Sequence, residues 1–168
     1  MKHLARTMTI YSCLYPGANL FQQKVIRQYP HINWKEGSRY MIYGGLFHGP
    51  LVHYWLQFAN HMFPGSAYKQ VLKKVLIDQV MFAPVALSCF YIGLSALEFK
   101  SVDYVKEEWL EKFPGTWATG ACIWPFLQAF NFRFIPITHR PLYVGIMGFF
   151  WTTLLSYWKS ESLIHPVV

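Results

Sequence analysis

Polar side chains inside long apolar segments are the candidates for chemistry in this sequence. Asp78 follows Lys73-Lys74-Val75-Leu76-Ile77 and stands at the start of an apolar run. A carboxylate costs about 2.5–3.5 kcal/mol at the centre of a membrane helix and less near its end, so it needs a partner or a function. Two interpretations stay open: a salt bridge to a nearby Lys or Arg that joins two helices, or a charge that lines or gates a pathway.

A stripe of two indoles and two amides marks a later apolar segment. At 100° per residue, the stripe falls within an arc of about 80° on one helical face. Its members are Trp117, Gly120, Trp124, Gln128 and Asn131. Such a stripe must face protein or water, so it serves either as inter-helix hydrogen bonds or as the wall of a hydrophilic pathway. Pro84 and Pro125 are predicted to bend the helices that carry them.

Small residues gather on two further faces, where they allow helix backbones to approach closely. These predicted packing positions are Gly45, Gly49, Gly145, Gly148, Thr152 and Ser156. His48 and His53 are five residues apart, which does not place them on one helical face as a metal-binding pair four residues apart would be. No metal site is therefore expected. The cysteines, Cys13, Cys89 and Cys122, are predicted to be small buried hydrophobic residues.

Catalytic motifs are missing from the sequence. There is no G-x-S-x-G, no H-E-x-x-H, no phosphate-binding glycine loop and no C-x-x-C. Each of these motifs places a nucleophile, a metal or a phosphate at a defined spacing. The chain is therefore predicted not to be an enzyme, and no cofactor is expected.

Apolar helices must position these side chains. The 168 residues are 54% hydrophobic and only 14% charged, against about 25% charged in typical soluble domains. The charges are clustered and leave charge-free runs at 7–23, 40–68, 79–97, 113–132 and 141–158. About 20 helical residues cross a hydrocarbon core of roughly 30 Å. The last four runs are predicted membrane helices, and the first, interrupted by Pro16-Gly17, is a candidate fifth.

The predicted fold class is therefore all-α: an integral membrane helical bundle of four to five transmembrane helices in a single multi-pass domain over residues 1–168. A charged stretch from Glu98 to Lys112 separates the third and fourth runs, and apolar residues recur in it at three- and four-residue steps. This pattern is typical of an amphipathic helix, which we predict to lie at the membrane interface.

The net charge of +7 belongs to the segments that flank the apolar runs. If all five runs cross the membrane, the two sides carry 7 and 8 Lys and Arg residues, a tie under the positive-inside rule. If only four cross, the side with both termini carries 10 against 5, which would place the termini on the cytosolic or matrix side. Because apolar runs separate the basic residues, nucleic acid is excluded as a partner. The expected partners are the lipid bilayer, a second copy of the chain, and a small-molecule or ionic solute.

One family of small membrane proteins resembles this sequence over about residues 40–160. Its C-terminal signature is similar to Trp124-Pro125-x-x-Gln128-x-x-Asn131-Phe132, followed by Pro136, Arg140, Trp151 and Leu155-Ser156. Its central blocks are similar to Asp78-Gln79 with Pro84, and to His48-Gly49-Pro50 with His53-Tyr54-Trp55. It is the Mpv-seventeen / Sym-one / peroxisomal membrane protein family, and residues 85–93 are most similar to its Mpv-seventeen-like branch.

The resemblance implies an integral protein of the mitochondrial inner membrane, with the peroxisomal membrane as the alternative. It implies a weakly selective channel or transporter that affects mitochondrial metabolite or nucleotide balance and reactive-oxygen homeostasis. A non-conducting scaffold or interaction protein is the alternative function. The resemblance adds Gln79 and Arg140 to Asp78, Trp124, Gln128 and Asn131 as candidate pathway-lining or helix-coupling residues. This sequence departs from the family pattern where Asn19 replaces an acid and where Trp117-Ala118 replaces a Tyr-Lys pair.

Overall fold

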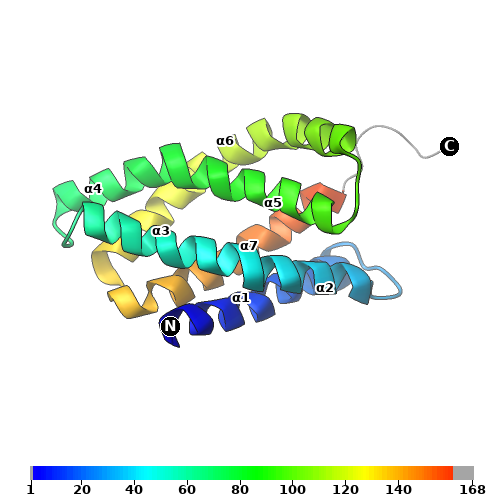
Figure 1. Ribbon diagram of the computed structural model, residues 1–168, viewed down its shortest axis with the longest axis horizontal. Coiled ribbons are helices and arrows are strands. Elements are labelled where there is room, and N and C mark those ends of the chain that lie inside the picture. The colour runs from blue at the N-terminus through cyan, green and yellow to red at the C-terminus, as the bar shows by residue number, and fades with distance from the viewer. Residues whose placement is uncertain (1, 161–168) are drawn as a thin grey trace.

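Five long helical segments form the described part, residues 2–160, of the computed structural model of the protein (Figure 1). They are α1 (Lys2–Phe21) with η1 (Gln22–Ile26); α2 (Trp34–Ile42), η2 (Tyr43–His48) and α3 (Gly49–Met62); α4 (Tyr68–Ile77), η3 (Asp78–Phe82) and α5 (Ala83–Leu97); α6 (Val102–Phe134); and α7 (Arg140–Ser160), preceded by the short η4 (Ile137–His139). Residues 2–160 contain no strand, which confirms the all-α fold class.

Turn chemistry in the connecting segments sets where the helices begin. The Asn33 side chain accepts a hydrogen bond from the backbone N–H of Glu36, and Ser101 caps α6 by accepting from the N–H of Tyr104. Gly65 adopts a φ of 85° in the turn before α4, a left-handed conformation that favours glycine.

Prolines widen two of the helical segments without ending them. Pro50 and Pro84 stand in the first turn of α3 and α5, and the π-helical turns η2 and η3 come immediately before. Proline has no N–H to donate four residues back, so the preceding turn loosens. η3 thus lies just before Pro84, and α6 continues through Pro125 as one helix; the bends predicted at these two prolines stay predictions.

The helical segments pack around one another in a bundle with two distinct ends. α1 contacts α2, α3 and α7, while α6 contacts α4, α5 and α7. The start of α1, the α3–α4 turn and the α6–α7 link lie at one end, called here the α3–α4 end (Figure 1). The segment after η1 and the α5–α6 turn lie at the other, the α5–α6 end (Figure 1). Each apolar run of the sequence therefore extends from one end toward the other.

Large apolar side chains cover the outside of the bundle, while many polar ones are buried. Phe126 is 76% exposed, Val80 74% and Phe150 67%, whereas Asn131 and Lys74 are fully buried. The three cysteines are exposed rather than buried, so the prediction of buried cysteines is wrong. They belong to this apolar exterior, where a small hydrophobic residue is equally accommodated.

One segment of the described chain, Tyr68–Leu97, is long and apolar enough to cross a membrane, with a mean hydropathy of 1.9. The remaining predicted membrane helices stay predictions. The helix predicted within Glu98 to Lys112 is present from Val102 onward as the first turns of α6, while its position at a membrane interface stays a prediction. These turns direct Glu108 inward, where its side chain is buried, so this segment extends the bundle.

Close approach of α1 depends on small residues of η2, α3 and α7. A Cβ at Gly44 would lie 2.6 Å from the carbonyl oxygen of Tyr11, and one at Gly45 would overlap the hydroxyl of Ser12. Gly49 and Gly145 are also close against α1. Gly148, predicted as a packing position, differs because an added Cβ would meet no atom within 4 Å.

These contacts make Gly44→Ala a sharp test of the packing. The added methyl group meets backbone that cannot rotate away, so we expect a loss of about 1–3 kcal/mol of stability. Thermal unfolding of the purified protein in detergent measures it. Gly148→Ala is the matched control and should change stability little; an equal loss in both variants would contradict the described packing.

Candidate functional site

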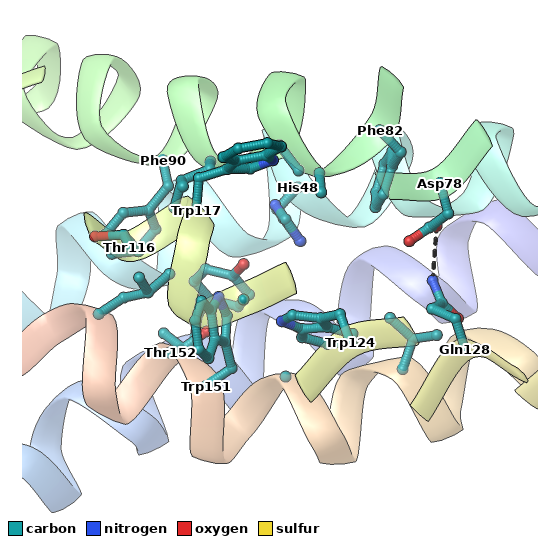
Figure 2. A pocket seen from close by; sticks show the side chains of 18 of the residues that line it. His48, Asp78, Phe82, Phe90, Thr116, Trp117, Trp124, Gln128, Trp151 and Thr152 are labelled. Atoms are coloured by element: carbon teal, nitrogen blue, oxygen red, sulfur yellow. Dashed lines mark hydrogen bonds between the residues drawn. The ribbon is translucent and has the colours of Figure 1, made fainter. Parts of the chain in front are cut away.

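A cavity of about 80 Å³ lies inside the bundle between α1, η2, α5, α6 and α7. Its wall is mainly apolar and rich in aromatic rings, with Trp117, Trp124 and Trp151 facing His48 and Phe90 (Figure 2). A volume of this size holds a handful of water molecules but no larger solute. The cavity is therefore too small to pass a larger solute in this conformation.

The carboxylate of Asp78 stands at one end of the cavity and is 2% exposed. Its Oδ1 accepts a hydrogen bond of 2.8 Å from Gln128 Nε2 (Figure 2). Trp55 Nε1 donates to the same oxygen at 2.8 Å, and Gln79 donates to Oδ2 at 3.1 Å. Within residues 2–160 Asp78 makes no ion pair, so the salt-bridge interpretation is wrong. Neutral donors from α3, η3 and α6 hold it instead.

The stripe on α6 points into the bundle. Trp117, Gly120, Trp124 and Gln128 line the cavity, and Asn131 lies beyond it, donating to Gln128 Oε1 at 2.9 Å. The Oδ1 atom of Asn131 is buried without a hydrogen-bond partner in the described chain. The stripe thus joins helices and lines a cavity, while a hydrophilic pathway along it stays a prediction.

Residues of α7 complete the cavity wall. Trp151 packs edge-on against Trp124 and over the bare Cα of Gly120, and Thr152 and Gly148 also line the cavity. Two of the predicted packing positions on α7 therefore face the cavity. Gly148 leaves room there because it has no side chain.

Arg140 lies apart from Asp78, although the sequence grouped the two. Its guanidinium donates to the carbonyl oxygens of Ile135 and Phe132, both at 3.0 Å, and to Asn60 Oδ1 at 3.4 Å. Lys74 Nζ donates to the same Asn60 oxygen at 3.3 Å. These contacts form a second polar layer at the α3–α4 end.

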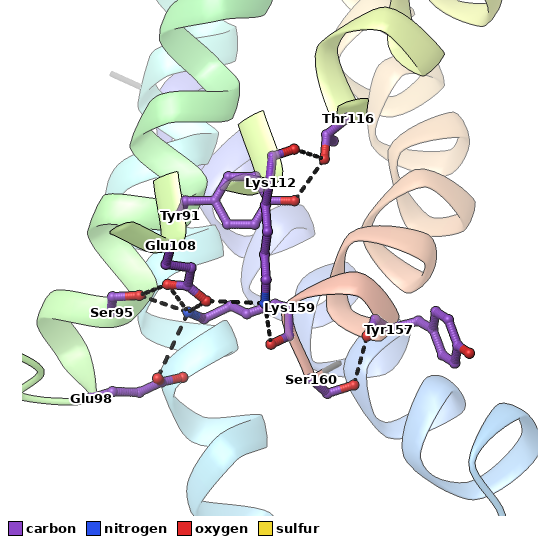
Figure 3. Close-up of polar contacts among 9 residues, drawn as sticks. All are labelled: Tyr91, Ser95, Glu98, Glu108, Lys112, Thr116, Tyr157, Lys159 and Ser160. Atoms are coloured by element: carbon purple, nitrogen blue, oxygen red, sulfur yellow. Dashed lines mark hydrogen bonds and ion pairs between the residues drawn. The ribbon is translucent and has the colours of Figure 1, made fainter. Parts of the chain in front are cut away.

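A third polar cluster at the α5–α6 end was missed by the sequence reasoning. Lys159 Nζ lies 3.0 Å from both carboxylate oxygens of Glu108, 3.7 Å from Glu98 and 2.7 Å from Ser95 Oγ (Figure 3). Ser95 also donates to Glu108, which is 1% exposed. The signal available in the sequence was an acid among apolar side chains on one helical face.

The same cluster adjoins the cavity. Lys112 lies 3.5 Å from Glu108, and the carbonyl of Lys112 accepts from Thr116, whose hydroxyl pairs with that of Tyr91 at 2.8 Å (Figure 3). Because Thr116 also lines the cavity, this chain of contacts separates the cavity from the α5–α6 end.

Amide side chains of α1 and η1 form a further group of hydrogen bonds, which connects α1 to α2 and α7. Asn19 donates to Glu36 Oε1 at 2.6 Å and to Ser156 Oγ at 2.8 Å, and Gln23 donates to Asn19. Burial raises the pKa of the Glu36 carboxyl, and the hydrogen bond from Asn19 partly offsets that rise. Ser156, predicted as a packing residue, therefore also carries hydrogen bonds.

The sequence is similar to several known proteins. A family model described as Mpv17 / PMP22 family matches residues 95–156. A Mpv17-like protein of Xenopus laevis is 37% identical over 162 residues, which cover 93% of this chain and 76% of that protein. The mitochondrial inner membrane protein Mpv17 of Xenopus laevis is 37% identical over 119 residues, covering 71% and 67%. The PXMP2/4 family protein 4 of Dictyostelium discoideum is 30% identical over 129 residues, covering 77% and 70%.

No solved structure matches this chain. The names of these relatives support the location expected from the sequence, the mitochondrial inner membrane, with the peroxisomal membrane as the alternative to which the PXMP2/4 name points. Together, the matched family model and the extent of the Xenopus similarity establish that this chain belongs to the Mpv17 / PMP22 family.

Proposed function

We propose that the protein is a weakly selective channel or transporter for small solutes, held in a closed state, that affects metabolite or nucleotide balance and reactive-oxygen homeostasis in mitochondria. In this proposal the runs 7–23, 40–68, 79–97, 113–132 and 141–158 all cross the bilayer. The pathway passes through the cavity that the α6 stripe lines.

The distribution of burial supports the membrane part of the proposal. Water-soluble proteins bury large apolar side chains, and charged side chains almost never become fully buried in them unless paired. Here Val80, Phe126 and Phe150 point outward while Asp78 and Gln128 lie inside. In a bilayer this arrangement is favourable, because the apolar side chains meet lipid and the polar ones meet each other.

The observation that carries the transport part is a cavity inside the bundle, lined mainly by apolar side chains, with a charged or polar layer near each end. At one end, Asp78 and Gln128 connect η3 to α6, and at the other, Glu108 and Lys159 connect α6 to α7. Side chains on separate helices form both layers, so a shift of the helices would open the cavity. Ionisable groups that face a bundle interior are typical of solute and ion pathways.

Asp78→Asn tests the pathway directly. The substitution removes the charge at the cavity while keeping a side chain of equal size, so we expect reduced preference for cations over anions. Reversal potentials of the purified protein in planar bilayers under a salt gradient measure this preference. Asp103→Asn, an exposed acid at the α5–α6 end, is the control. Absence of conductance above protein-free membranes would rule out the channel.

Glu108→Gln tests the layer at the α5–α6 end. Lys159 then loses its closest carboxylate, and breaking a buried ion pair costs about 3–5 kcal/mol, which destabilises the closed arrangement. We expect more frequent opening in single-channel recordings. The neighbouring Glu107 is exposed, so Glu107→Gln should behave like the unaltered protein. Equal behaviour of the two variants would show that the cluster does not hold the cavity closed.

A non-conducting scaffold is the second candidate, and the three neutral hydrogen bonds to Asp78 favour it. Gln128 joins Asp78 to Asn131, so its loss leaves buried polar groups without partners. We expect Gln128→Leu to cost about 1–3 kcal/mol of stability, measured by thermal unfolding in detergent. The exposed Gln57→Leu is the control. If the protein is a scaffold, Gln128→Leu lowers stability in this way, and neither the unaltered protein nor Asp78→Asn conducts ions in planar bilayers.

A further inference from the structure

A groove of about 410 Å³ opens at the α3–α4 end, between the start of α1, the middle of α3 and the link into α7. Four basic side chains line it: His3, Arg6, His53 and Arg140. Neither Asp nor Glu is among its lining residues. With its two histidines neutral at pH 7, Arg6 and Arg140 therefore give the groove its net positive charge.

Arg140 forms a buried part of this groove, since it is only 5% exposed. Its hydrogen bonds go to two backbone carbonyls and one amide oxygen, and within residues 2–160 none of its partners carries a negative charge. Lys74, buried beside it, likewise bonds to Asn60 and to the carbonyl of Gly65. Buried charges are normally paired, so two neighbouring cations with neutral partners favour an anion nearby.

The side chain of Arg6 is exposed at the same groove. In the described chain it enters no hydrogen bond or ion pair, so its planar guanidinium is free to contact a ligand. Arginine binds phosphate through two parallel hydrogen bonds, which matches this chemistry.

Charge is distributed unequally over the two ends of the bundle. Asp78 is the only acid between the α3–α4 turn and η3, and its carboxylate is occupied by three donors. The other acids of the described chain lie at the α5–α6 end: Glu36, Glu98, Asp103, Glu107, Glu108 and Glu111. The two ends carry similar numbers of Lys and Arg, but in the described chain the acids offset most of this positive charge at the α5–α6 end and little of it at the α3–α4 end.

We propose that this groove binds the phosphate headgroup of an anionic phospholipid. Lipid rather than a soluble phosphate is favoured by the apolar side chains beside the basic ones, among them Leu4, Leu142 and Ile137, the last 57% exposed. The groove also lies at the end of a bundle whose exterior is apolar. Basic pockets between membrane helices bind such headgroups, because the phosphate meets the cations while the acyl chains follow the outer helix surfaces.

Native mass spectrometry of the purified full chain tests the proposal. The protein in mild detergent is mixed with equal amounts of phosphatidylglycerol and phosphatidylcholine, and bound lipids are counted. We expect preferential retention of phosphatidylglycerol. Because one basic residue near an anionic lipid surface contributes about fivefold in affinity, Arg6→Gln should weaken retention about fivefold.

Lys69→Gln is the matched control, because Lys69 is exposed at the same end but outside the groove. It should retain phosphatidylglycerol as the unaltered protein does. Arg6 is exposed, so unfolding temperatures of both variants should stay unchanged. Equal retention of the two lipids, or equal losses in the two variants, would overturn the proposal. Displacement of the lipid by millimolar inorganic phosphate at constant ionic strength would also overturn it, in favour of a soluble ligand.

Discussion

A carboxylate buried between helices can remain only where other groups replace the water it has lost, and the hydrogen bonds to Asp78 meet this requirement. The donors come from α3, from η3 itself and from α6. The need to satisfy the Asp78 carboxylate thus holds α3, η3 and α6 together around its two oxygen atoms. The cavity lies beside Asp78, and η3 and α6, which the hydrogen bond from Gln128 joins, form part of its wall.

The same requirement explains the other polar layers and the apolar exterior. Lys159 and Glu108 satisfy each other at one end, and Lys74 and Arg140 share Asn60 at the other. With polar groups directed inward, apolar side chains remain for the outside, where water would make them unfavourable and lipid would not. Membership in a family with a member named as a mitochondrial inner membrane protein agrees with this arrangement.

Much of this architecture could be predicted from charge placement and helical periodicity. The gaps between charges located the helices, and the 100° period placed Gln128 and Asn131 on the inward face. Partners could not be predicted, because pairing depends on which helices are neighbours: Asp78 bonds to Trp55 rather than to a cation, and Arg140 lies elsewhere. The inward turn of Glu108 escaped notice because its charged segment was interpreted as interfacial, without its continuation into α6. The role of Gly148 could not be predicted for the same reason: a small residue either lets a neighbouring helix approach or leaves a cavity, and the sequence does not show which.

In the proposed arrangement, apolar side chains face outward to lipid while polar side chains lie inside the bundle. The accessibility of spin labels in a bilayer tests this arrangement most directly. Labels are attached at single cysteines replacing Val80, Phe126 or Phe150, in a background without Cys13, Cys89 and Cys122, with Lys106 as the water-facing control. Collision with oxygen, which concentrates in lipid, is compared with collision with a water-soluble nickel complex. We expect the three apolar positions to favour oxygen and Lys106 to favour nickel. Preference for nickel at Val80, Phe126 and Phe150 would contradict a bundle with a polar interior and a lipid-facing exterior.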